Sequence, residues 1–371
     1  MASIRKRGNT YEYRISHKVK EKYEYITKGG FQTEAEAKKE AKIVEGELIK
    51  NINYNKRNMD LKEYMMEYYE NKRKPNVSPT TQKRYERNYK IFCQYFKNKK
   101  LKEISNYHYQ DFLDDYGQNK SKESVAKIHS QIRAAFKYAR ANGYIDTDPT
   151  FDIKINYSVP PRPRELFFIH EHQFKALLKC ITTDINVTNI SKHLLLLACA
   201  SGARFGELIA LTFDDYNVFT QEININKSFD YITTFDFKET KTESGNRKVT
   251  IDDQTNKLMA KYISYQKLDS RNDTGFLFPS PDFPNQPISH RAVLNCLHNL
   301  CDLLNINKIG IHALRHSHAS IMLLNGLSVE YISERLGHSS TETTRKYYLH
   351  IVEEMKKQSD KNVINLFKEM Y

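Results

Sequence analysis

Alternating apolar and polar residues mark the beginning of the chain. Residues 10–16 and 22–27 each alternate between aromatic or aliphatic and polar side chains, a period that predicts two half-buried strands. The Gly29-Gly30 pair is expected to end this sheet. Thr33, with Glu36 three residues later, matches a capping box, so a helix is expected to begin there. The pattern therefore predicts a small sheet backed by one helix.

Apolar residues at helical spacing dominate the next part of the chain. They predict four helices, at residues 61–72, 81–97, 107–116 and 122–142, with Ser105 and Ser121 as N-caps. The helix at 81–97 carries aromatic residues at intervals of three and four, which indicates a face packed in the core. Its basic residues are Lys83, Arg84, Arg87 and Lys90. These form either a solvated surface or one that contacts a phosphate backbone.

A proline-rich basic segment at residues 157–164 separates these helices from the rest of the chain. Beyond it the pattern is mostly helical, with strands expected at 221–229 and 247–251 and a polar stretch between them. We therefore predict a multidomain α+β protein. Its expected parts are a small N-terminal β-sheet plus helix at residues 1–55, a helical domain at 59–155, and a mostly α domain with a small antiparallel sheet at 165–371.

Composition narrows the class of partner and excludes several kinds of site. Lys and Arg number 58 against 45 Asp and Glu, giving a net charge of +13, which favours a polyanionic partner. A lysine-rich surface encoded by an AT-rich genome would give the same excess. Five cysteines without a Cys-x-x-Cys pair argue against a disulfide framework and a zinc ribbon. With no signal peptide and no apolar run long enough to span a bilayer, a reduced, cytoplasmic protein without membrane contact is expected.

Arginine and histidine residues recur where a phosphate could bind. Arg204 stands at the expected start of a helix over residues 205–211, where unpaired N–H groups and a guanidinium fork both favour an anion. Glu207, three residues later, lies on the same face and can orient that guanidinium. His312 and Arg315 share a face of a later helix, so Arg315 could add a second fork with His312 beside it as donor or acid/base.

The remaining histidines of that stretch suggest packing rather than metal binding. His316 and His318 point to other faces of the same helix and are expected to be packing or surface residues. His312 and His316 have the i, i+4 spacing of a zinc pair, but no carboxylate lies in register with them. We therefore expect no metal site.

A tyrosine nucleophile would complete this chemistry. His338 precedes a helix that carries Tyr347 and Tyr348. A phenol has a pKa of about 10 and attacks phosphorus only when positive charge and a base are near. Lys241, in a polar turn, could give a proton to the leaving 5′-oxygen, although such a lysine is more often only a surface residue. The phosphotyrosine link conserves the bond energy, so no ATP is needed, and the chain has no phosphate-binding glycine loop followed by Lys-Ser or Lys-Thr.

These residues, in this order, resemble the motifs of the tyrosine recombinases. The motifs are SGARFGELIAL with Arg204, TKTESGNRKV with Lys241, HALRH with His312 and Arg315, LGH with His338, and the tyrosine before His350. The likeness is to phage and integrative-element integrases of Gram-positive bacteria and spans essentially the whole chain. One departure is Phe213, where many relatives have tryptophan, a conservative change.

The resemblance implies a role for each motif residue. Arg204, His312, Arg315 and His338 would hold and activate the scissile phosphate, and Lys241 would be the general acid. The nucleophile is expected to be Tyr348, because Tyr348-Leu-His350 matches the family's Tyr-x-His pattern. Tyr347 remains the alternative, since it lies nine residues after His338, a spacing used in other branches.

The resemblance also implies architecture and partners. Residues 1–55 would bind arm-type DNA sites, 59–155 would be a SAM-like core-binding domain, and 165–371 the catalytic domain. A homotetramer would cleave and rejoin double-stranded DNA at att-like sites through a 3′-phosphotyrosyl intermediate, integrating and excising a mobile element without a cofactor. An excisionase and a host DNA-bending protein are implied partners. Residues 362–371 would dock on a neighbouring protomer or pack on their own domain.

Two other functions remain open from the residues alone. A type IB topoisomerase-like enzyme would use the same chemistry without pairing two duplexes, although the separate N-terminal unit argues against it. A non-catalytic DNA-binding protein could keep the fold, but it would have no use for Lys241 or Tyr348.

Overall fold

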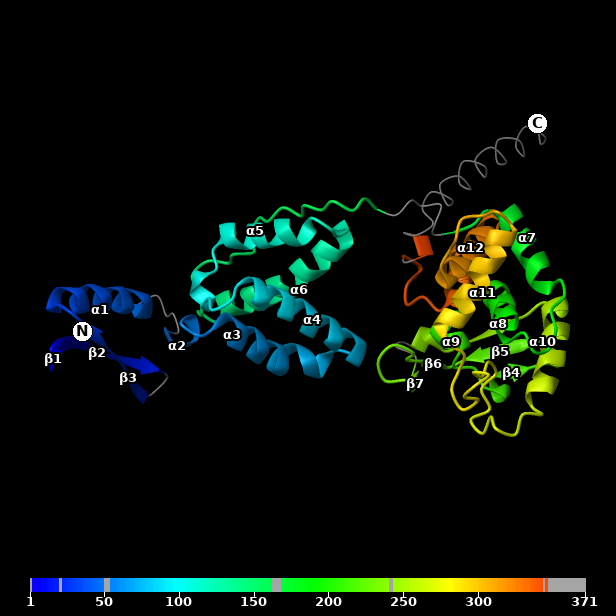
Figure 1. The fold of residues 1–371 in the computed structure, drawn as a ribbon, viewed down its shortest axis with the longest axis horizontal. Helices are drawn as coiled ribbons and strands as arrows, with labels where there is room; N and C mark the ends of the chain where they lie inside the picture. The colour runs from blue at the N-terminus through cyan, green and yellow to red at the C-terminus, as the bar shows by residue number, and fades with distance from the viewer. Residues whose placement is uncertain are drawn as a thin grey trace, which may run out of the picture. The chain divides into compact units, whose positions relative to one another are not determined.

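A computed structural model describes residues 2–19, 22–49, 54–161, 168–239, 243–342 and 344–345. The chain divides into two compact units, Met1–Pro161 and Arg162–Tyr371. Figure 1 traces the order of the elements, and each unit is described by itself. Small antiparallel sheets and many helices confirm the expected α+β class. Within the described residues no helix is long and apolar enough to cross a membrane.

The first unit begins with a three-stranded antiparallel sheet covered by a helix (Figure 1). Its elements are β1 (Ser3–Arg7), β2 (Thr10–Val19), β3 (Lys22–Phe31) and α1 (Glu34–Ile49). The inward-facing side chains Tyr13, Ile15 and Ile26 pack against Ala41 and Val44 of the helix. This arrangement leaves the opposite face of the sheet uncovered by α1.

The capping box at the start of α1 is confirmed, but the expected end of the sheet is wrong. The Glu36 amide donates to Thr33 Oγ1 (3.2 Å), and the Thr33 amide donates to Glu36 Oε2 (3.3 Å). Strand β3 runs through both glycines to Phe31, because a register shift opposite them forms a bulge and Gly30 adopts φ +92° there. Strand β1 escaped prediction because its residues are nearly all polar and exposed.

Helices with an aromatic core make up the rest of the first unit. They are α2 (Tyr54–Arg57), α3 (Leu61–Tyr68), α4 (Pro79–Tyr95), α5 (Asn106–Gly117) and α6 (Lys122–Ala141). Ser105 and Ser121 cap α5 and α6 as expected. Helix α3 is shorter than expected and passes into the π-helical turn Tyr69–Arg73, because Pro75 cannot extend a regular helix.

Helix α4 has the two faces that its sequence predicted. Tyr89 and Phe92 are buried, and the Phe92 ring meets the rings of Phe112 and Phe136 at centroid distances of 5.1 and 6.0 Å. Its four basic residues, Lys83, Arg84, Arg87 and Lys90, are exposed. The helix therefore presents a row of positive charge to solvent.

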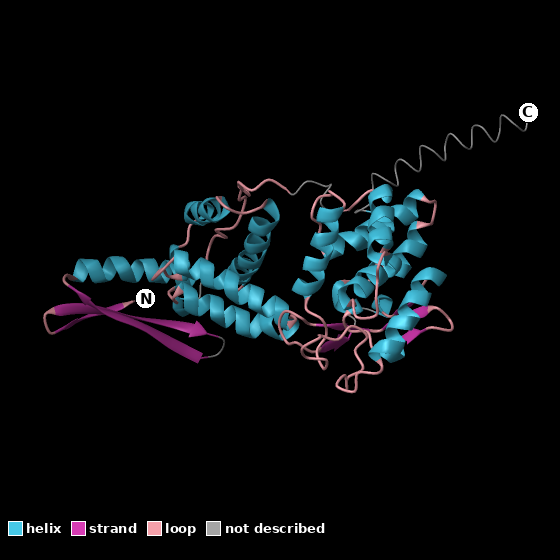
Figure 2. Ribbon diagram, turned by 45° about the vertical axis from the view of Figure 1, so that its right-hand side comes forward, coloured by secondary structure: helices cyan, strands magenta, loops and turns pink. Residues whose placement is uncertain are grey.

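The second unit is mostly helical, with short strands (Figure 2). Its helices are α7 (Glu171–Thr182), α8 (Ile190–Ser201), α9 (Phe205–Leu208), α10 (Asp253–Gln266), α11 (His290–Leu303), α12 (Ile311–Leu324) and α13 (Val329–Leu336). Helix α8 is buried along nearly its whole length and packs against α7, α10, α11 and α12. It is thus the central helix of this unit.

The strands of the second unit form two separate sheets rather than one long strand pair. Strands β4 (Tyr216–Asn217), β5 (Glu222–Ile225) and β8 (Arg247–Thr250) form one antiparallel sheet, and β6 (Lys227–Phe229) pairs with β7 (Phe237–Glu239) in another. The expected strand at 221–229 is therefore interrupted, and the polar stretch after it contains β7. The Asp230 carboxylate closes the intervening loop by accepting the amides of Ile232 and Thr233.

Candidate active site

Arg204 stands at the junction of α8 and α9. Gly202 ends α8 at φ +65°, and a Cβ there would lie 2.7 Å from the His318 ring, so the chain turns where only glycine fits. Arg204 then caps α9, which ends at Leu208, earlier than the sequence indicated. Glu207 Oε1 accepts from Arg204 Nη1 at 2.7 Å and Oε2 accepts the Arg204 amide at 2.9 Å. The carboxylate therefore orients the guanidinium, as the spacing predicted.

Arg315 joins three segments that are distant in sequence. It lies in α12, which Gly310 caps, and only 3 % of its surface is exposed. Its Nη1 donates to the carbonyl of Gly202 at 2.9 Å and its Nη2 to that of Leu336 at 2.7 Å. The end of α8 and the end of α13 are therefore fixed to α12 beside Arg204.

His338 follows the end of α13. Gly337 ends that helix at φ +68°, and its carbonyl accepts from Arg204 Nη2 at 3.3 Å. His338 Nδ1 lies 2.7 Å from Oγ1 of the buried Thr344, which fixes the plane of the half-buried ring. The hydrogen bonds of Arg204 and Arg315 to Gly337 and Leu336 thus place His338 next to both guanidiniums.

The histidines of the site are held neutral. Partial burial, followed by the charges of His316, Arg315 and Arg204, lowers the pKa of His312 to about 4. The pKa of His338 is also lowered to about 4, chiefly by burial and to a smaller extent by the positive charges of Arg315, Arg204 and Arg247. Neutral imidazoles at neutral pH can accept a proton or donate one hydrogen bond each. Four predicted site residues, Arg204, His312, Arg315 and His338, therefore share one electrostatic environment.

The other two histidines of α12 pack against neighbouring side chains, as expected. His318 Nδ1 lies 2.8 Å from the carbonyl of Cys199 in α8 and Nε2 lies 3.2 Å from Arg335 Nε, so the ring serves packing between helices. His316 contacts the ring of His312 at a centroid distance of 4.8 Å. Within the described part of the chain no three His, Cys, Asp or Glu side chains gather as metal ligands would.

Two arginines of the site escaped the sequence prediction. Arg247, the first residue of β8, donates to Glu207 Oε2 at 2.8 Å and to the carbonyl of Arg335 at 2.7 Å. Arg335 itself donates to the carbonyls of Ala200 and Thr250. One signal could have found Arg247, because the alternation of β8 puts it on the same buried face as Val249.

Lys241, Tyr347, Tyr348, His350 and residues 362–371 lie outside the described residues. Their roles stay predictions.

The lowered pKa values of these histidines make stability depend on pH. The folded-state pKa values of His312, His318 and His338 are all about 4, each lowered first by burial, whereas an unfolded histidine titrates near about 6.5. The unfolded chain therefore binds more protons below that pH, so stability should fall as the pH drops from about 6.5 toward 4. Urea denaturation of the full chain at several pH values and fixed ionic strength measures this loss of stability. In His318→Gln the free energy of unfolding should fall less steeply with pH. An equally steep fall in that variant would show that His318 does not contribute to the pH dependence.

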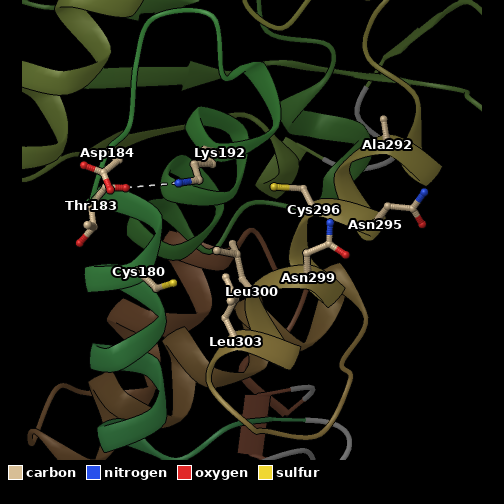
Figure 3. Close-up of a pocket in the computed structure, with 10 residues that line it drawn as sticks. All are labelled: Cys180, Thr183, Asp184, Lys192, Ala292, Asn295, Cys296, Asn299, Leu300 and Leu303. Atoms are coloured by element: carbon tan, nitrogen blue, oxygen red, sulfur yellow. Dashed lines mark hydrogen bonds between the residues drawn. The ribbon is translucent and has the colours of Figure 1, made fainter.

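A separate cavity of about 610 Å³ lies between α7, α8 and α11 (Figure 3). Leu300 and Leu303 contribute apolar surface to it, and Lys192 Nζ donates to the carbonyl of Thr183 at its rim (3.2 Å). Of the site residues that the structure describes, Arg204, His312, Arg315 and His338, none lines this cavity.

Comparison with known proteins assigns the family. The model described as "Phage integrase family" matches residues 168–355, and "Phage integrase, N-terminal SAM-like domain" matches residues 60–116. The chain belongs to the phage integrase family. The larger match includes all six predicted site positions of this integrase. It is a tyrosine-type site-specific recombinase of the mobile-element kind, and the topoisomerase-like and non-catalytic alternatives are not favoured.

Related proteins cover most of this integrase. It is 25 % identical over 288 residues to the integrase of Staphylococcus phage L54a. The matched region covers 72 % of this chain and 81 % of that protein. The ICEBs1 integrase of Bacillus subtilis is 25 % identical over 279 residues, 72 % of this chain and 73 % of that protein. A tyrosine recombinase XerC-like protein of Caldanaerobacter subterraneus is 24 % identical over 91 % of both chains.

Solved structures share the fold. The Tn1549 transposon integrase in complex with transposon right end DNA has a TM-score of 0.65 at 18 % identity, covering 78 % of this chain and 95 % of that one. The lambda integrase dimer bound to a COC′ core site has a TM-score of 0.58 at 16 % identity, covering 93 % of both chains. The fold of this integrase is therefore one that two DNA-bound integrases share.

Proposed function

We propose that this recombinase cleaves DNA by attack of the Tyr348 phenol oxygen on a phosphate held by Arg204, Arg315 and the neutral imidazoles of His312 and His338. The gathering of these groups through hydrogen bonds to Gly202, Leu336 and Gly337 carries the proposal. Two guanidiniums at one phosphate would stabilise the charge that develops in the transition state and favour the phenolate.

The bond changes balance without a cofactor. The tyrosine oxygen forms a bond to phosphorus while the bond to the 5′-oxygen breaks, leaving a 3′-phosphotyrosyl link. The phenol gives up its proton to a neutral histidine or to water, and Lys241 supplies a proton to the leaving 5′-oxygen. Attack by the 5′-hydroxyl of a second strand reverses these changes and joins the new ends.

We also propose the organisation that the resemblance implies. The sheet of residues 1–55 would bind arm-type sites, residues 59–155 would bind the core site, and residues 165–371 would perform the chemistry. The exposed basic face of α4 supports the second role. Four protomers would act on two duplexes, with an excisionase and a host DNA-bending protein setting the direction of the reaction.

A trapped covalent complex tests the proposed chemistry. The full chain is mixed with a nicked duplex from the end of the element that encodes it, so that cleavage releases a short strand and cannot reverse. A protein–DNA adduct that survives denaturing electrophoresis should form in EDTA and without nucleotide. Absence of any adduct on DNA that the chain binds would refute the covalent mechanism.

The exposed face of the N-terminal sheet should bind DNA through Arg14. This side chain stacks over the ring of Tyr25 at 3.9 Å, and Tyr25 is itself 57 % exposed. Binding of the full chain to end-derived duplexes should weaken steeply with salt, and Arg14→Ala should lower the salt dependence by about one unit of slope if Arg14 meets a phosphate. Fluorescence anisotropy at several salt concentrations measures this.

A matched variant separates this effect from general loss of charge. Lys42 is exposed on α1, the helix that covers the opposite face of the sheet. Lys42→Ala should leave both affinity and slope at their wild-type values. Equal losses in the two variants would remove the sheet face as the contact surface.

A further inference from the structure

Arg247 is a buried cation with three distinct acceptors. Its side chain is 5 % exposed, and it donates from Nη2 to Glu207 Oε2 (2.8 Å), from Nε to the carbonyl of Arg335 (2.7 Å) and from Nη1 to the carbonyl of Gly245 (3.0 Å). A guanidinium that uses its Nε and both Nη atoms in this way is held in one orientation.

Each acceptor belongs to a different part of the site. Glu207 is the carboxylate that orients Arg204. Arg335 lies in the last turn of α13, just before Gly337 and His338. Gly245 belongs to the turn Glu243–Gly245, which directly follows the Lys241 segment in the chain. Arg247 therefore connects the segment of Arg204, the segment of His338 and the turn Glu243–Gly245.

Packing at Gly337 shows how closely Arg247 fits. A Cβ at Gly337 would lie 2.7 Å from Arg247 Nη1 and 3.0 Å from the carbonyl oxygen of Ser244. The end of α13 thus rests directly on the guanidinium and on the turn beside it. A smaller side chain at position 247 would leave this junction without its central contact.

Arg247 also adjusts the charge of the site. Glu207 is buried, and its two oxygens accept from Arg204 and Arg247 together. Burial raises the pKa of Glu207, but Arg247 and Arg204 outweigh it, so the pKa is lowered and the carboxylate stays ionised. With Arg247 balancing that negative charge, the charge of Arg204 is left to act on a phosphate.

We propose that Arg247 is a positioning residue for DNA cleavage, holding Glu207, the end of α13 and the turn Glu243–Gly245 in register so that Arg204 and His338 meet one phosphate. The inference rests on the proposed covalent mechanism. Displacement of catalytic groups by about 1 Å can cost about 10²-fold in rate, which sets the expected size of the effect.

The test is the rate of adduct formation under single-turnover conditions with saturating protein, measured from pH 5 to 9. Arg247→Met should cleave about 10²-fold more slowly at neutral pH. Without Arg247 the pKa of Glu207 rises, so the variant should begin to lose rate at a higher pH than the wild type does. Arg247→Lys keeps a charge beside Glu207 but cannot reach all three acceptors. It should therefore cleave slowly, while its rate begins to fall at the same acidic pH as that of the wild type.

Lys248 provides the matched control. It is the next residue of β8 and is exposed on the opposite face of the strand, so Lys248→Met removes the same charge without touching Glu207. This variant should keep the wild-type rate and pH profile at saturation. If Arg247→Met does not fold, Arg247→Lys carries the test.

Different failures have different meanings. A wild-type chain that forms no adduct refutes the proposed covalent mechanism. A wild-type adduct together with wild-type rates in Arg247→Met, or in Arg247→Lys when that variant alone folds, refutes only the role of Arg247. An Arg247→Met rate that falls equally at every pH, in step with a lower melting temperature, shows a purely structural residue and overturns the inference.

Discussion

Replacing Tyr348 by phenylalanine is expected to abolish the covalent protein–DNA adduct while DNA binding persists. The change removes one oxygen atom, the proposed nucleophile, and leaves the ring in place. No other atom of that side chain can attack phosphorus, so the adduct should fall below detection on a nicked duplex. Denaturing electrophoresis measures the adduct, and anisotropy with the same duplex measures binding.

Tyr347→Phe is the matched control for this experiment. The two tyrosines are adjacent in sequence, so the variants differ only in which phenol is lost. Tyr347→Phe should form the adduct at the wild-type rate. Full adduct yield from Tyr348→Phe, with none from Tyr347→Phe, would move the nucleophile to Tyr347, the spacing found in other branches of the family.

Local geometry explains why part of the site could be predicted from the sequence. Arg204 and Glu207 are three residues apart across the first turn of a helix, so their ion pair follows from helical periodicity alone. The shared helix of His312 and Arg315 follows in the same way. The order of the motifs along the chain then indicated that these two pairs and His338 form one site. Helical periodicity could not show this, because the pairs and His338 are far apart in the sequence.

The contacts that unite the site depend on tertiary structure and could not be predicted. Arg315 donates to the carbonyls of Gly202 and Leu336. Every residue has a backbone carbonyl, so the sequence does not indicate which carbonyls a buried arginine will contact. Arg247 was overlooked for a related reason, since a charged residue in a strand is usually exposed. Its burial makes sense only once Glu207 is known to lie opposite it.

Strand boundaries show the same limit in the fold. The stretch 221–229 is predicted to be one strand, yet its first half, β5, pairs with β8 and its second half, β6, pairs with β7. Which partner each half takes is decided by the loop that Asp230 closes, not by the alternation itself. The division into three domains stays a prediction, because the compact units separate only at Pro161.

Removing the Arg204 guanidinium should slow cleavage by about 10²–10³-fold, the usual cost of losing one transition-state donor. Its side chain is 42 % exposed, so Arg204→Ala should leave the melting temperature close to that of the wild type. Arg204→Lys should recover little, because a single ammonium cannot both pair with Glu207 and fork onto two phosphate oxygens. Arg271→Ala, which removes an exposed arginine paired with Asp269 in the same unit, is the control and should cleave normally.

Arg315 supplies the contrast that separates catalysis from folding. Because its guanidinium is buried and donates to two carbonyls, Arg315→Ala should slow cleavage and also lower stability, by roughly 1–3 kcal/mol for the donors withdrawn. Single-turnover rates and urea denaturation on the same preparations distinguish the two effects. Arg204→Ala should therefore lose rate without stability, and Arg315→Ala should lose both. A loss of rate below tenfold in Arg204→Ala would mean that its exposed guanidinium does not meet the phosphate, and that Arg315 and the neutral histidines do so without it.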